Sequence, residues 1–115
     1  PFSPSTFRRY VRAAWLCEGA ATFLAGQVPH LRGAIVRRLR EGGKPSFPPA
    51  ARDAYVLGGT VFALLESERG PKACAELAGA DTDRSGRVLV EQAFGRPAAT
   101  VERAWFGYLD SLGAG

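Results

Sequence analysis

AYVLGGTVFALLESER, residues 54–69, is the stretch that decides the fold. It predicts a long helix from just after Pro49 to about Arg69, because three- and four-residue spacing places an apolar stripe on one face. Two glycines, Gly58 and Gly59, fall in mid-helix, where each costs about 1 kcal/mol relative to alanine. We therefore expect another element to pack closely against the backbone there. The stripe consists of Tyr55, Leu57, Val61, Phe62, Leu64 and Leu65.

Glycine and proline clusters divide the rest of the chain into further helical segments. The segment GGKPSFPP, residues 42–49, contains three prolines and is expected to be a loop. A chain of 115 residues fits one domain, so residues 1–115 are predicted to form a compact, all-α, single-domain bundle of five or six helices. The remaining helices are expected over residues 5 or 6 to 25, with a potential break near Arg12, and over about 31–40, 72–78, 85–94 and from about 97 onward.

Composition supports a folded helical protein. The chain holds 19 Ala and 11 Leu against 8 Val and a single Ile, which favours helix over strand. No apolar run reaches the roughly 20 residues of a membrane span, and no signal peptide is present, so no compartment is predicted. The start lacks an initiator Met, which is typical of a processed end or an artificial boundary.

The net charge of +4 is concentrated in residues 31–44, where five basic side chains surround Leu31, Ile35 and Leu39. This four-residue spacing is typical of an amphipathic helix with a solvated basic face. Binding to nucleic acid or to an anionic surface is the alternative, but no aromatic residue is interleaved for base stacking. We therefore expect no nucleic-acid partner.

Cysteine and histidine usage predicts no metal site within the chain. Cys17 and Cys74 lack CxxC spacing and are expected to be small buried residues, although one disulfide remains open. The only histidine, His30, follows Pro29 and is given no role.

Glu18 does not fit its surroundings. It is the only formally charged residue among the nineteen between Arg12 and Arg32. A carboxylate in such an apolar helix must be hydrogen-bonded or paired, coordinate a cation, or take up a proton. An arginine partner or a surface position is one interpretation, and metal ligation is the other.

The stretch WLCEGAATFLAG, residues 15–26, resembles the W-(L/F)-x-E-G-x-A-x-(Y/F)-x-x-G segment of gluzincin zinc metallopeptidases, especially the peptidase-MA-like families. Weaker similarity follows in the same order along the chain and covers most of it. The matching residues are Trp15, Glu18, Gly19, Ala21, Phe23 and Gly26, then Tyr55, Val61 or Phe62, Leu65, Gly70 and Lys72, and finally Phe94, Gly95, Val101, Glu102, Trp105, Tyr108 and Leu109.

This resemblance implies that Glu18 is the third zinc ligand of a peptidase. An H-E-x-x-H helix would supply two histidine ligands and the general base. Only seventeen residues precede Glu18 and none is His, so we expect that helix upstream of Pro1 and expect this chain alone to be inactive. A peptide or protein substrate would then be reached only through the full-length enzyme.

Tyr55 is the other residue to which the resemblance gives a role, because gluzincins often use a tyrosine hydroxyl to stabilise the oxyanion. Its alternative role is packing against the first helix. The alternative for the whole chain is a non-catalytic helical protein-interaction module, in which Glu18 is a buried carboxylate that contacts an arginine.

A third pattern, residues 81–88, matches the first eight positions of an EF-hand calcium loop. The twelfth position is Gln92, where a bidentate Glu is required, and no second loop exists. We therefore favour an Asp-rich turn and helix N-cap, in which Asp83 or Ser85 accepts backbone N–H bonds. A calcium-binding domain is the least favoured hypothesis.

Overall fold

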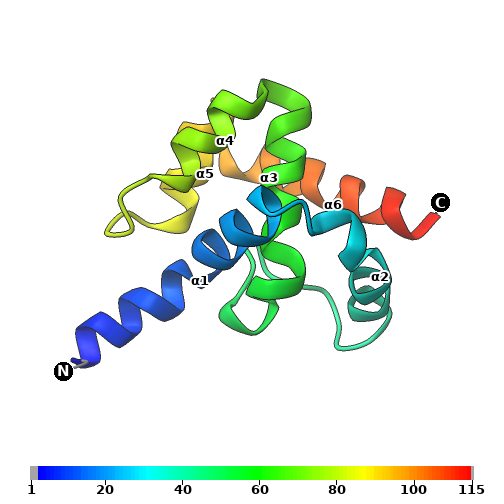
Figure 1. The fold of residues 1–115 in the computed structure, drawn as a ribbon, viewed down its shortest axis with the longest axis horizontal. Coiled ribbons are helices and arrows are strands. Elements are labelled where there is room, and N and C mark those ends of the chain that lie inside the picture. Colours follow the sequence, from blue (N-terminus) through cyan, green and yellow to red (C-terminus); the bar gives the residue numbers. More distant parts are fainter. Residues whose placement is uncertain (1–2, 115) are drawn as a thin grey trace.

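The fold is built around a central helix, α3 (Ala54–Arg69). The computed structural model describes residues 3–114, with side-chain surroundings for residues 3–113. α3 packs against all five other α-helices of the described chain, and it crosses the middle of the molecule in Figure 1. Its central residues are buried on all sides, as expected of a helix that is apolar all round. Fully buried among them are Leu57, Thr60, Val61, Phe62 and Leu65.

The described residues form an all-α, single-domain bundle with no strand, as predicted. The radius of gyration is 13.5 Å, close to the roughly 13 Å of a compact domain of this size. Within residues 3–114, no helix has both the length and the hydropathy needed to cross a membrane. Around α3 lie α1 (Pro4–Leu24), α2 (Arg32–Arg40), α4 (Pro71–Ala78), α5 (Gly86–Phe94) and α6 (Ala98–Ala114), with 3-10 turns η1 (Val28–Leu31) and η2 (Ala51–Asp53).

α1 is one continuous helix, so the potential break near Arg12 is absent. It begins where Ser3 accepts a hydrogen bond from the backbone N–H of Thr6. Its first half extends away from the bundle in Figure 1, and its burial starts only at Ala13. Phe7, Tyr10 and Val11 repeat at three- and four-residue spacing along α1, yet all three are exposed.

The mid-helix glycines of α3 mark a close crossing with α1, as predicted. A Cβ atom built on Gly58 would lie 2.7 Å from the carbonyl oxygen of Trp15 and 3.0 Å from the backbone nitrogen of Gly19. One built on Gly59 would lie 2.6 Å from Oγ1 of Thr22. The two helices thus approach to a distance that only glycine allows, and this contact fixes α1 against the central helix.

The basic face of α2 is only partly solvated, which corrects the sequence interpretation. Arg38 donates two hydrogen bonds to the buried carboxylate of Asp53, at 2.6 and 3.1 Å. Its other donors reach the carbonyl oxygens of Glu41 and Gly43. Hydrogen bonding to Asp53 raises the pKa of Arg38. The loop after α2 is therefore held to the start of α3 by a bidentate, charge-assisted contact.

Replacing Asp53 with alanine is expected to lower the free energy of unfolding by about 2–3 kcal/mol, because Arg38 would keep a largely buried charge without its partner. Asp83 is the matched control, since it pairs with Arg9 at 2.9 Å between side chains that are 53% and 62% exposed. Asp83→Ala should cost about 0.5 kcal/mol or less. Urea denaturation measures both variants. Equal losses of unfolding free energy in the two variants would show that the buried pair stabilises the fold no more than the exposed pair does.

Candidate functional site

Glu18 lies in the second half of α1, immediately before the glycine that meets α3. Its side chain is partly exposed. Within residues 3–113, no arginine or lysine pairs with its carboxylate, and no hydrogen bond to it is formed. The arginine contact expected of a structural carboxylate is thus absent at Glu18. The chain uses Asp53 in that role instead.

The face of α1 around Glu18 is apolar and carries small side chains. Ala14 and Ala21 lie one turn before and after Glu18 on the same face, and Val11 continues that face two turns before it. Val11 and Ala21 are exposed, whereas Ala14 is buried. Beside this face Leu24 is 67% exposed. Since Ala14 already belongs to the core, the exposed part of this face consists of Val11 and Ala21.

Tyr55 is in the first turn of α3, on the side that carries Gly58 and Gly59 and meets α1. Its side chain is 55% exposed, so its assignment to the core-facing stripe is wrong. No hydrogen bond joins its hydroxyl to Glu18 among the described residues. The structure therefore places Tyr55 and Glu18 on the two helices of one crossing, with no hydrogen bond between them.

The acidic turn before α5 uses its oxygen atoms for local structure. Asp81 accepts a hydrogen bond from the backbone N–H of Asp83 at 2.9 Å, and Ser85 caps α5 by accepting from the N–H of Val88 at 3.2 Å. Asp83 pairs with Arg9 of α1. The predicted turn and Ser85 cap are confirmed, but Asp81, rather than Asp83, accepts the backbone bond of the turn.

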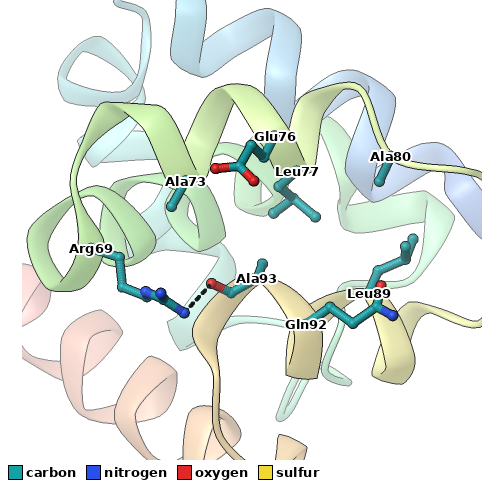
Figure 2. A pocket seen from close by; sticks show the side chains of 8 residues that line it. All are labelled: Arg69, Ala73, Glu76, Leu77, Ala80, Leu89, Gln92 and Ala93. Carbon is teal, nitrogen blue, oxygen red and sulfur yellow. Dashed lines mark hydrogen bonds between the residues drawn. The ribbon is translucent and has the colours of Figure 1, made fainter.

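Gln92, the twelfth position of the calcium-loop pattern, lines a cleft between α4 and α5. Figure 2 shows this cleft, with Arg69, Glu76 and Gln92 around Leu77 and Leu89. Its volume is about 260 Å³, below the roughly 300 Å³ at which small-molecule sites begin. Arg69 is already engaged by the carbonyl oxygen of Ala93 at 3.3 Å. The cleft therefore adds no reactive group to the candidate site.

The two cysteines are free thiols in different surroundings. Cys17 is exposed on α1, against expectation, whereas Cys74 is buried and donates to the carbonyl oxygen of Phe62. Burial, with a smaller contribution from Glu66, raises the pKa of the Cys74 thiol to about 11. Cys74 therefore remains a thiol well above neutral pH, where an ordinary cysteine with a pKa of about 8.5 begins to ionise.

We expect a thiol-specific disulfide reagent at pH 8 to modify Cys17 rapidly and Cys74 only when the chain opens. The folded protein should release one equivalent of the coloured thiolate, and the protein in guanidinium chloride should release two. Cys17→Ser is the control and should remove the rapid phase alone. Two rapid equivalents from the folded protein would contradict the burial of Cys74.

Among residues 3–113, no group of three or more His, Cys, Asp or Glu side chains is arranged to hold a metal ion. His30 is exposed in η1. Comparison with protein families, with curated proteins and with solved structures finds no match for this chain. The candidate site therefore consists of Glu18, the small-residue face beside it, and Tyr55 on the neighbouring helix.

Proposed function

We propose that this chain is the helical C-terminal part of a gluzincin-like zinc metallopeptidase, in which Glu18 is the carboxylate ligand. The observation that carries the proposal is that the carboxylate of Glu18 is partly buried and has no partner among residues 3–113. Glu18 lies in the most apolar stretch of α1. Since partial burial of an unpaired carboxylate costs free energy, such a residue is suited to a partner from elsewhere.

The surface around Glu18 supports the same proposal. The small, exposed Ala21 leaves room for a helix to approach α1, and the exposed Val11 would be covered by it. The crossing at Gly19, the residue after Glu18, holds this part of α1 against α3. A ligand is most effective when its own element is fixed in this way. The helix that would cover this face is the one that carries the two histidines.

The residues present do not complete a zinc site. Catalytic zinc takes three protein ligands, and the described residues offer only Glu18 at this face. The two other ligands and the general base must come from residues outside these 115, so no catalytic step is assigned to this chain. In the complete site zinc would polarise the peptide carbonyl and activate a water molecule. Tyr55 is the residue of this chain proposed to lie near the developing oxyanion.

The second candidate function is a non-catalytic protein-interaction module. The exposed aromatic and aliphatic side chains of α1, Tyr10, Val11 and Leu24, favour it. This function differs from the first because it needs no metal and gives Glu18 only a structural role. The arginine contact that this function predicts for Glu18 is absent among residues 3–113.

The reading frame upstream of Pro1 separates the two functions. The peptidase proposal expects an H-E-x-x-H within about ten residues of Pro1, since one helical turn must present both histidines to Glu18. The present chain alone should show no saturable zinc binding in titration calorimetry. An upstream frame without this motif would end the catalytic proposal and leave the interaction module.

A further inference from the structure

A second surface, separate from Glu18, is an apolar groove of about 760 Å³. This volume lies within the roughly 300–1,000 Å³ of small-molecule sites. Six elements converge on it: the end of α1, η1, α2, α3, α4 and α6. We call it the apolar groove, and its walls include Phe23, Ile35, Ala63, Cys74, Tyr108 and Leu112.

The floor of the apolar groove reaches the protein core. Ile35 and Cys74 line it, and each is only 1% exposed. Leu24 and Pro29 stand exposed at its rim. Removing apolar surface from water is favourable by about 25 cal/mol for each Å². Burial of an aliphatic chain in this groove would therefore contribute favourable binding free energy along the whole chain.

The wall of the groove formed by α2 and α6, which pack against each other, presents hydrogen-bond donors. Arg32 donates through Nε and Nη2 to the carbonyl oxygen of Leu112, at 3.1 and 2.9 Å. A guanidinium group has five N–H donors, so three remain. Tyr108 lies one turn before Leu112, and its hydroxyl bonds to no described residue. Burial raises the pKa of Tyr108, so that hydroxyl stays protonated and can donate.

The wall of the groove formed by α3 and α4 carries an acidic residue. Glu66 lines this wall, close enough to Cys74 to raise the pKa of its thiol. A second anionic group on a ligand would be repelled there. The charges therefore fit a molecule with one anionic head at Arg32 and an uncharged chain that extends toward Cys74.

We propose that the apolar groove binds a straight-chain aliphatic carboxylate, with its head on Arg32 and Tyr108 and its chain over Ile35 and Cys74. A planar guanidinium matches a carboxylate better than it matches a neutral or cationic head. This inference does not depend on the function proposed for Glu18.

Titration calorimetry of the 115-residue chain with dodecanoate, below its micellar concentration, tests the proposal. We expect saturable binding of one molecule per chain. Dodecanol and dodecyltrimethylammonium should bind at least about tenfold more weakly, because neither offers an anion to Arg32. Ala63→Leu should weaken dodecanoate binding at least about tenfold by filling the groove.

Variants on the donor side of the groove complete the test. Arg32→Gln and Tyr108→Phe should each weaken dodecanoate binding about tenfold, because each removes a donor to a charged head group. Arg40→Gln, an exposed site on the same helix, should bind as the unchanged protein does. Thermal melting verifies that each variant folds. If Arg32→Gln does not fold, Tyr108→Phe still tests the donor side of the groove. Absence of saturable binding, equal binding of the cationic detergent, or indifference to Ala63→Leu would overturn the proposal.

Discussion

Gly58→Ala is expected to lower the free energy of unfolding by about 1–2 kcal/mol. The added Cβ would lie 2.7 Å from the Trp15 carbonyl oxygen and 3.0 Å from the Cα and nitrogen of Gly19. These atoms belong to the backbone, so no flexible side chain can move aside. Alanine gains about 1 kcal/mol in helix propensity, but overpacking of a rigid contact costs about 1–3 kcal/mol and sometimes more. The clash therefore outweighs the propensity.

Gly107→Ala is the matched control for this prediction. Gly107 also lies inside a helix, α6, but nothing stands within 4 Å of a Cβ built on it. That variant should gain about 0.5–1 kcal/mol, because only propensity changes. Urea denaturation of both variants and of the unchanged protein measures the difference. A Gly58→Ala variant as stable as Gly107→Ala would contradict the close crossing of α1 and α3.

Glu18→Gln is expected to weaken zinc binding more than about 100-fold in a polypeptide that includes the residues upstream of Pro1. Loss of a group that merely orients a ligand already costs about 10–100-fold in metal affinity, and loss of the ligand itself should exceed this. Peptide hydrolysis should fall in parallel. Glutamine keeps the size of the side chain, so the stability without metal should stay within about 0.5 kcal/mol.

Competition with a chelator of known affinity measures this effect. Glu76→Gln, an exposed carboxylate on α4, is the control and should retain zinc. If Glu18→Gln also retains zinc and activity, Glu18 is not the ligand. Loss of zinc together with loss of stability would identify a folding defect instead, so thermal melting without metal accompanies the titration.

The helices could be predicted from sequence because residues at or next to their ends determine where each helix begins and ends. Pro71 and Gly95, for example, stand where α4 begins and α5 ends. The glycine pair of α3 also predicted a close neighbour correctly, since mid-helix glycine is costly without one. Local composition therefore determined the number, length and order of the helices.

The faces that these helices bury could not be predicted equally well. Tyr10 and Tyr55 share the periodicity of core residues, yet both are exposed, because periodicity does not say how far a neighbouring helix extends. The Arg38–Asp53 pair joins residues that are distant in sequence across a proline-rich loop, and no spacing rule connects them. Such contacts depend on the path of the loop.

For the candidate site, the sequence singled out Glu18 as a carboxylate in apolar surroundings, and its lack of a partner became visible only in the structure. The apolar groove had no sequence pattern, because its walls come from six separate elements. Residues that line a cavity share a place in space rather than a spacing along the chain.

Zinc stoichiometry of the polypeptide that starts upstream of Pro1 tests the central claim most directly. Elemental analysis of the purified protein is predicted to give one zinc ion per chain, with none retained when the upstream residues are removed. A longer polypeptide that folds with α1 covered but carries no zinc would contradict the claim.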